Sequence, residues 1–171
     1  DFPRGHRGVT PDQVRSLLAG LDPAIVPVGV FVDRPAEEAA ALLNDGTIQV
    51  AQLHGREDAA YIAALRALAP GKEIWKAFKV RSPEDLAAAA ASPADRILLD
   101  NGYGTGQSFD WSLAGSVTRP FLLAGGLTSE NIPDAVARLH PYGLDLSSGV
   151  ETDRLKDRDK ILAAVAAARK E

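Results

Sequence analysis

The chain has 171 residues, of which 46% are hydrophobic and 25% charged, and its formal net charge at pH 7 is −4. This length suits one domain with a substantial core, and scattered Lys and Arg on an acidic chain argue against nucleic acid and anionic membranes as partners. No apolar run approaches the roughly 20 residues of a membrane span and no signal-peptide pattern opens the chain, so we expect a cytoplasmic protein.

Strand-like and helix-like patterns alternate along the whole sequence. Short apolar runs rich in β-branched residues predict six strands, at residues 25–32, 48–53, 74–80, 96–99, 120–123 and 144–146. Amphipathic stretches predict six helices, at residues 12–21, 36–43, 56–68, 84–91, 129–139 and 157–169. Start signals such as Thr10-Pro11, Ser82-Pro83 and Thr128 precede three of these helices. We see no linker and no second domain.

An unbroken alternation of strands and helices predicts a parallel sheet covered by helices, as a closed barrel or an open doubly wound sheet. Two glycine-rich segments favour the barrel: residues 124–128 (AGGLT) and 147–151 (SSGVE) come directly after the last two predicted strands. In (β/α)₈ TIM barrels the loops after the last two strands build a phosphate site from exposed N–H groups and a helix N-terminus. The alternative is that they are two ordinary turns. No GxGxxG or Walker-type loop follows the first predicted strand.

The predicted barrel is incomplete. A complete one usually needs more than about 200 residues, and six predicted strands leave two of the eight unaccounted for. The chain has no methionine and begins Asp1-Phe2-Pro3. We therefore expect residues 1–171 to form a single barrel domain that lacks its N-terminal part, in a fragment or a processed piece.

Candidate catalytic side chains should lie where strands end, because this is the face on which barrels carry their active sites. Asp100 ends an apolar strand, where the surroundings can raise a carboxyl pKa toward that of a general acid; the alternative is a helix cap or loop carboxylate. Alternation along residues 48–54 places His54 at the polar end of an otherwise apolar face, where it contacts substrate or orients a loop. Asp145 lies inside the last predicted strand, where an unpaired carboxylate is costly, so a substrate amine or a structural hydrogen bond should satisfy it.

Metal chemistry is not expected. The chain has no cysteine and its three histidines are widely separated, which argues against a structural or catalytic zinc site. The missing cysteines also leave no disulfide framework.

Four segments together resemble the signature blocks of the phosphoribosylanthranilate isomerase family. They are VAQLHG at residues 50–55, LLD at 98–100 followed by GTGQSFDW at 104–111, LAGGLTSEN at 123–131 and DLSSGVE at 145–151. The glycine loops are shared by many barrels, whereas the QLHG and GTGxxFDW blocks together are far more specific. The resemblance implies a (β/α)₈ barrel that converts N-(5-phospho-β-D-ribosyl)anthranilate to 1-(2-carboxyphenylamino)-1-deoxy-D-ribulose 5-phosphate. This is an Amadori rearrangement in tryptophan biosynthesis, with no cofactor and no metal.

The same resemblance implies roles for individual residues. Asp100 falls at the general-acid position that protonates the ring oxygen of the sugar. The family's general base is a cysteine on the first strand, and this chain contains no cysteine. Residues 2–11 resemble the segment just after the second strand, so the first strand, the first helix and the second strand would lie upstream of Asp1. Arg7 would hold the anthranilate carboxylate, with Arg4 as the competing assignment.

The remaining implied contacts concern the ligand and the assembly. Asp145 would lie near the anthranilate amine, and the phosphate would bind at Gly125, Gly126, Ser147, Ser148 and Gly149. The family implies a small phosphorylated substrate and a monomer or homodimer, free-standing or once fused to indole-glycerol-phosphate synthase. Two alternatives stay open. One is another sugar-phosphate barrel of histidine or tryptophan biosynthesis, which lacks the QLHG and GTGxxFDW pair. The other is a non-catalytic phosphate-binding remnant without the base.

Overall fold

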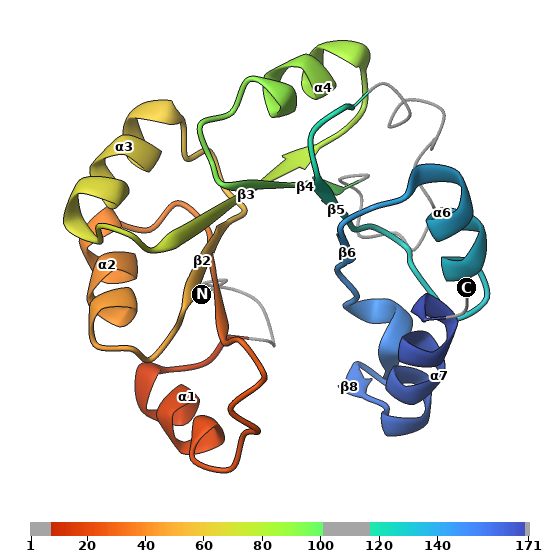
Figure 1. Cartoon of the computed structure of the whole chain (residues 1–171). Helices are drawn as coiled ribbons and strands as arrows, with labels where there is room; N and C mark the ends of the chain where they lie inside the picture. The colour runs from red at the N-terminus through yellow and green to blue at the C-terminus, as the bar shows by residue number, and fades with distance from the viewer. Residues whose placement is uncertain (1–7, 101–116, 170–171) are drawn as a thin grey trace. The chain divides into compact units, whose positions relative to one another are not determined.

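The computed structural model describes residues 8–100 and 117–169 (Figure 1). The chain divides into two compact units, the first formed by Asp1–Ala77 and Ser92–Asp95 and the second by Phe78–Ala91 and Arg96–Glu171. Within each unit, parallel strands alternate with helices. The predicted α/β class with parallel strand pairing is therefore confirmed.

The described part of the first unit contains three strands and three helices in the order α1 (Pro11–Leu18), β1 (Val28–Phe31), α2 (Ala36–Asn44), β2 (Val50–Leu53), α3 (Ala59–Leu68) and β3 (Glu73–Lys79), whose last two residues belong to the second unit. Strand β2 pairs in parallel with β1 on one side and with β3 on the other, so that Val50 lies opposite both Val28 and Glu73. Figure 1 shows α2 and α3 beside these strands. Their apolar faces pack against alternate strand residues in a core that includes Ala39, Leu43, Ala51, Leu53, Ile62, Leu65 and Ile74.

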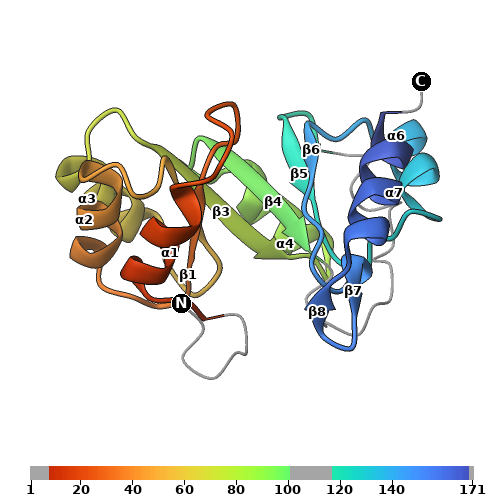
Figure 2. The ribbon, with the colours of Figure 1, turned by 90° about the horizontal axis from the view of Figure 1, so that it is seen from below.

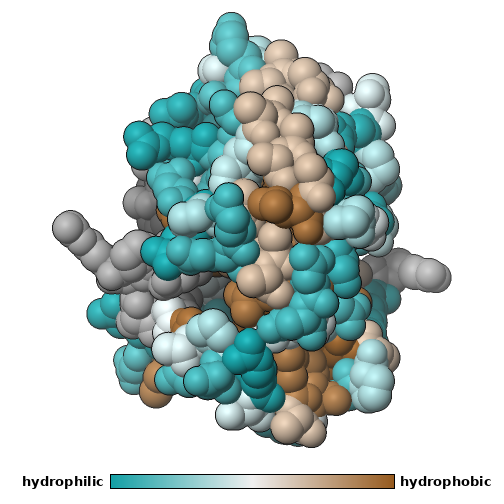
Figure 3. Space-filling view, turned by 90° about the vertical axis from the view of Figure 1, so that its left-hand side faces the viewer, coloured by the Kyte–Doolittle hydropathy of each residue, from teal (hydrophilic) through white to brown (hydrophobic). Residues whose placement is uncertain are grey.

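Helix α1 is held by polar contacts and buries none of its side chains. Thr10 and Gln13 form a capping box, and the Arg15 guanidinium lies 3.0 Å from the Asp45 carboxylate. Hydrogen bonds from Thr47 and from Arg15 lower the pKa of Asp45 to about 2. Figure 3 views the side of this unit where the helices lie and shows apolar atoms as a broken band between polar ones.

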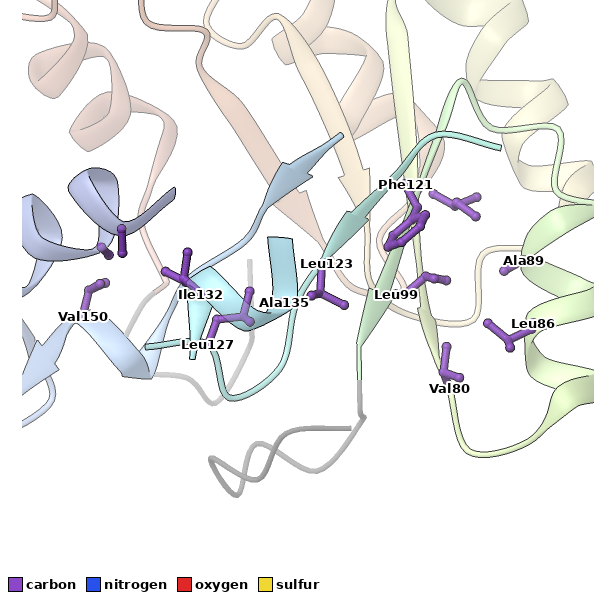
Figure 4. Close-up of a cluster of buried hydrophobic side chains, with 13 residues drawn as sticks. Val80, Leu86, Ala89, Leu99, Phe121, Leu123, Leu127, Ile132, Ala135 and Val150 are labelled. Carbon is purple, nitrogen blue, oxygen red and sulfur yellow. The ribbon is translucent and has the colours of Figure 1, made fainter. Parts of the chain in front are cut away.

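The second unit contains α4 (Pro83–Ala90), β4 (Arg96–Asp100), β5 (Phe121–Leu123), α6 (Ile132–Leu139), β6 (Gly143–Leu144), the short 3₁₀ helix η1 (Ser148–Val150), β7 (Glu151–Thr152), β8 (Leu155–Lys156) and α7 (Arg158–Ala168). Strand β5 pairs in parallel with β4 and β6, and β7 and β8 form an antiparallel hairpin, seen beside α7 in Figure 2. The core of this unit runs from Val80 and Leu86 through Leu99, Phe121 and Leu123 to Leu127, Ile132 and Val150 (Figure 4).

The first and last predicted strands are longer than the structure has them. The run at residues 25–32 gives a strand only from Val28, because Pro27 has no N–H group and its carbonyl instead accepts from the N–H of Gln49. The last strand ends at Leu144. Asp145 therefore follows the strand, although its N–H still donates to the Leu123 carbonyl at 2.8 Å.

Two helices start later than predicted, because residues expected in their first turns serve other contacts. The Glu57 side chain accepts hydrogen bonds from backbone N–H groups, and Asp58 caps α3 instead. Thr128 donates its N–H to Asn131, so residues 128–131 form a turn before α6. The β7–β8 hairpin and η1 were not predicted.

Among the described residues, β1 of the first unit pairs only with β2 and β6 of the second unit pairs only with β5, apart from the strands of the β7–β8 hairpin, which pair with each other. Beside β6 lies a groove of about 800 Å³. Its largely apolar lining includes Leu144 at the end of β6, Leu146 two residues further on, and Ile161 and Val165 of α7. Ile161 and Val165 are 38% and 43% exposed. An open strand edge beside apolar surface favours pairing with another chain.

We therefore expect the 171-residue chain to self-associate in a concentration-dependent way. Ile161→Glu together with Val165→Glu should weaken this association by about tenfold or more, because association would then bury negative charges in the groove. Sedimentation velocity over a concentration series measures the effect. Ala163→Glu is the control, since Ala163 is exposed on the same helix and does not line the groove. A wild-type chain that stays monomeric at high concentration would contradict the expectation.

Candidate active site

Three strand ends of the second unit lie at one level. Ala124 donates its N–H to the Leu99 carbonyl and Asp145 donates its N–H to the Leu123 carbonyl, each at 2.8 Å. Asp100 follows Leu99 directly as the last residue of β4. The backbone pairing therefore brings together Asp100, the glycine-rich loop that begins at Ala124, and Asp145. These are three of the positions that the sequence predicted for the site.

The loop after β5 is shaped by two glycines with positive φ, +88° at Gly125 and +65° at Gly126. Residues with side chains rarely adopt this conformation. Asn131 fixes the loop, because its side chain accepts from the Thr128 N–H and donates to the Gly126 carbonyl, both at 2.9 Å. The loop backbone is thus held in place by the residue directly before α6.

The two glycine-rich loops touch each other. A Cβ atom at Gly149 would overlap the carbonyl oxygen of Leu127, so a side chain there cannot be accommodated without a shift. Leu127 and Val150, one from each loop, are buried in the same apolar cluster (Figure 4). The sequence predicted that these loops act together, and the structure brings them into contact.

Basic side chains lie around the second loop. The Lys156 ammonium donates to the Ser147 carbonyl at 2.9 Å and lies 2.9 Å from the Glu151 carboxylate. Lys160 donates to the Glu151 carbonyl at 2.7 Å. Ser147 and Ser148 are exposed. The loop therefore combines exposed hydroxyl groups with nearby positive charge.

Asp145 has a raised pKa, first because it is removed from solvent and second because the negative charge of Asp100 opposes its ionisation. Lys156 acts in the opposite direction. The sequence singled out Asp145 only as a costly carboxylate near a strand, and the structure adds that its pKa is raised.

His54 lies in the first unit, directly after β2, and its N–H donates to the Phe31 carbonyl at 2.8 Å. Around it lies a polar cluster that was not predicted from the sequence: Asp33, Glu57 and Lys76. A signal was present in the sequence, because Lys76 interrupts the apolar run at residues 74–80 at a position that shares a face with Ile74.

Several predicted residues lie outside the described part of the chain. These are Arg4 and Arg7, proposed for the anthranilate carboxylate, and the GTGQSFDW block at residues 104–111. Across residues 8–100 and 117–169, no group of three or more acidic or histidine side chains is placed to hold a metal ion. Over the same residues, no helix is long and apolar enough to cross a membrane.

A family model for "N-(5'phosphoribosyl)anthranilate (PRA) isomerase" matches residues 2–167. A curated N-(5'-phosphoribosyl)anthranilate isomerase from Acetivibrio thermocellus is 40% identical over 174 aligned positions, covering 94% of this chain and 79% of the relative. The chain belongs to the N-(5'-phosphoribosyl)anthranilate isomerase family. The resemblance seen in the sequence motifs is thereby confirmed, and the chain is an isomerase of tryptophan biosynthesis.

Solved structures of this family match the same chain. One is a phosphoribosyl anthranilate isomerase in complex with reduced 1-(o-carboxyphenylamino)-1-deoxyribulose 5-phosphate, with a TM-score of 0.84 and 30% identity over 98% of this chain and 83% of that one. Another comprises mutually generated monomers of the dimeric isomerase from Thermotoga maritima, with a TM-score of 0.83 and 29% identity over 98% of this chain and 84% of that one.

The raised pKa of Asp145 predicts a pH-dependent stability. The folded state binds this proton more tightly than the unfolded chain, so the group favours folding below about pH 3.8. This contribution is lost as the pH rises through the folded-state pKa. Asp145→Asn removes the ionisation. We expect the variant to melt higher than wild type at pH 7, by about 2 °C or more. The gain should shrink at pH 4. Thermal melts at the two pH values measure this, and an equal effect at both would contradict the assignment.

Proposed function

We propose that Asp100 is the general acid of the isomerisation. Opening of the sugar ring breaks the bond between C1 and the ring oxygen, while the nitrogen lone pair forms a C=N bond and a proton passes to that oxygen. Asp100 lies at the end of β4, beside the glycine-rich loops, where a phosphorylated sugar would present its ring. A base must then remove a proton from C2, and the resulting enolamine gives the ketone product by losing the proton of its C2 hydroxyl and gaining one at C1.

We infer that Asp145 lies near the anthranilate amine. Support comes from its place directly after β6 and from the raised pKa, which reflects low solvation beside a second carboxyl group. Such a site favours a group that donates a hydrogen bond or carries positive charge when the ring opens. Should Asp100 prove dispensable, Asp145 is the next candidate for the acid.

The phosphate is assigned to Gly125, Gly126, Ser147, Ser148 and Gly149. The observation that supports this assignment best is the contact between Gly149 and the backbone of Leu127, because it brings the two glycine-rich loops together. Each charge-assisted hydrogen bond to a phosphate oxygen contributes about 1.5 to 3 kcal/mol.

The general base of the family is absent from these 171 residues, which contain no cysteine. We propose that a preceding strand, helix and strand supply it and complete a single eight-stranded barrel domain. The open sides of β1 and β6 and the apolar groove along β6 support this idea, because a closed barrel has no such edges. We also propose a cytoplasmic enzyme that is a monomer or a homodimer, free-standing or once fused to indole-glycerol-phosphate synthase. The dimeric relative from Thermotoga maritima supports the homodimer.

A second candidate function, a non-catalytic phosphate-binding remnant, is suggested by the same missing cysteine. Turnover by the 171-residue chain, measured with and without the N-terminal segment of a relative fused ahead of Asp1, separates the two. The isomerase proposal expects turnover once the segment is present. A remnant would stay inactive in both forms while still binding phosphate.

In the chain with that segment restored, Asp100→Asn should lower turnover by roughly 10²- to 10⁴-fold, the usual effect of losing one general acid. Affinity for a product analogue should change little, since the fold and the phosphate loops are untouched. Asp134→Asn is the matched control, because Asp134 pairs with Arg138 on the exposed surface of α6. If Asp100→Asn kept near wild-type turnover, Asp145 would become the candidate for the general acid.

Titration with inorganic phosphate tests the loop assignment separately. The amide resonances of Gly126 and Gly149 should shift on binding, and Ser148→Asp should weaken binding by about tenfold or more through charge repulsion. Ala163→Asp places the same charge on the exposed side of α7 and should leave affinity unchanged. Shifts confined to other parts of the chain would rule the assignment out.

A further inference from the structure

The β7–β8 hairpin of the second unit has no part in the proposed reaction. Its two turn residues, Asp153 and Arg154, have left-handed backbones with φ +51° and +66°. Neither is glycine, so this tight turn holds the chain in a conformation that residues with side chains rarely adopt. A strained turn persists only when the contacts around it stabilise it. The contacts of the hairpin therefore show what it does.

The register of the hairpin brings two opposite charges together. Glu151 lies opposite Lys156 in the antiparallel pairing. The Lys156 ammonium lies 2.9 Å from the Glu151 carboxylate, and the Glu151 side chain is only 7% exposed whereas that of Lys156 is 49% exposed. Opposite charges on facing residues of paired strands attract each other. The buried carboxylate thus fixes where the ammonium lies.

The same ammonium contacts the start of the second glycine-rich loop. It donates to the Ser147 carbonyl at 2.9 Å, nine positions earlier in the chain. At the other end of the loop, the Asp157 N–H donates to the Val150 carbonyl at 2.9 Å. The residues that follow the loop therefore hold both of its ends.

The carbonyl groups of this segment accept hydrogen bonds from the protein. The Ser147 carbonyl also accepts from the Val150 N–H at 3.4 Å, and the Ser148 carbonyl accepts from the Glu151 N–H. Lys160 donates to the Glu151 carbonyl at 2.7 Å. A carbonyl oxygen that faced an anion would repel it, because a carbonyl is an acceptor that carries partial negative charge. Carbonyls that are already bonded to the protein therefore suit a loop that binds phosphate.

We propose that Lys156 and Glu151 are positioning residues that hold residues 147–149 in the shape that binds the phosphate group of the substrate. The inference rests on the proposed assignment of the phosphate to this loop. Lys156 acts through the Ser147 carbonyl and Glu151 acts through Lys156, so neither side chain needs to touch the phosphate. All of these contacts lie within the second unit.

Two single variants and their combination separate positioning from a direct effect of charge. Lys156→Met removes the donor to Ser147, and Glu151→Met removes the carboxylate that holds Lys156, each with a side chain of similar length. Calorimetric titration of the full chain with inorganic phosphate gives the affinity. The titrations are run at a temperature at which thermal melts show every variant to be folded.

Two further variants are controls. Leu86→Ala lowers stability without touching the loop, because Leu86 lies on α4 and is buried in the core of the same unit. Arg138→Met removes one positive charge from the unit by breaking an exposed ion pair on α6, Arg138 with Asp134 at 3.2 Å. Both should bind phosphate within about twofold of wild type.

Positioning predicts that Lys156→Met and Glu151→Met each bind phosphate about tenfold or more weakly than wild type. The double variant should bind within about twofold of Lys156→Met, because residues that act through one another do not give additive effects. The direction of the change at Glu151 separates the two explanations. Removing a negative charge strengthens the binding of an anion if charge alone matters, whereas losing a positioning residue weakens it.

The proposal is overturned by unchanged or tighter binding in Glu151→Met, by unchanged binding in Lys156→Met, or by an equal loss in Leu86→Ala. If the wild-type chain does not bind phosphate, the proposed function fails instead. The positioning claim is then tested by amide hydrogen exchange, which should become faster at Ser148 and Gly149 in both single variants but not in Arg138→Met. Unchanged exchange at these two amides would contradict it.

Discussion

Parallel pairing of β4, β5 and β6 is the constraint on which the candidate site depends. The bonds from Ala124 to Leu99 and from Asp145 to Leu123 set the ends of these strands level with one another. Because parallel strands present all their carboxyl ends on one side, residues far apart in sequence meet there without any direct side-chain attraction. The groups at the three strand ends then decide the chemistry: a carboxyl group, a glycine loop, and a second carboxyl group.

The second unit combines this backbone alignment with a rigid apolar support. Leu127 and Val150 anchor the two loops in the same core that holds Leu99 and Leu123 (Figure 4). A ligand that needs several N–H groups in fixed positions gains from such support, since little conformational freedom is lost on binding. In the first unit, the turn around His54 is held by a buried ion pair, Lys76 with Glu57. In each unit, the strand ends are held by contacts within that unit.

Much of the fold could be predicted from the sequence, because strand and helix periods are local signals. The contact between the glycine loops at residues 124–128 and 147–151 could also be predicted, since each loop comes directly after a strand. The predicted boundaries of two elements were wrong because of single residues. Pro27 lacks the N–H group that a strand needs. The Glu57 side chain accepts from the N–H groups of Asp33 and Gly55, and the helix begins after it. The buried Lys76 was missed because its partner lies 19 positions away in sequence.

The raised pKa of Asp145 could not be predicted from the sequence either. It depends on burial and on the nearby Asp100 charge, which only the three-dimensional pairing of β4, β5 and β6 creates. Family membership, in contrast, could be predicted from short motifs, since QLHG and GTGxxFDW seldom occur together by chance. Motifs identify the chemistry of a site, whereas packing shifts the pKa values of its groups.

The most direct test of the proposed site is a crystal structure of the chain, with the N-terminal segment of a relative restored, bound to reduced 1-(o-carboxyphenylamino)-1-deoxyribulose 5-phosphate. We expect the phosphate to accept hydrogen bonds from the loops at Gly126 and Gly149. We also expect the Asp100 carboxyl to lie within hydrogen-bonding distance of the oxygen that belonged to the sugar ring. A phosphate bound away from these loops, or an Asp100 carboxyl remote from that oxygen, would contradict the proposed site.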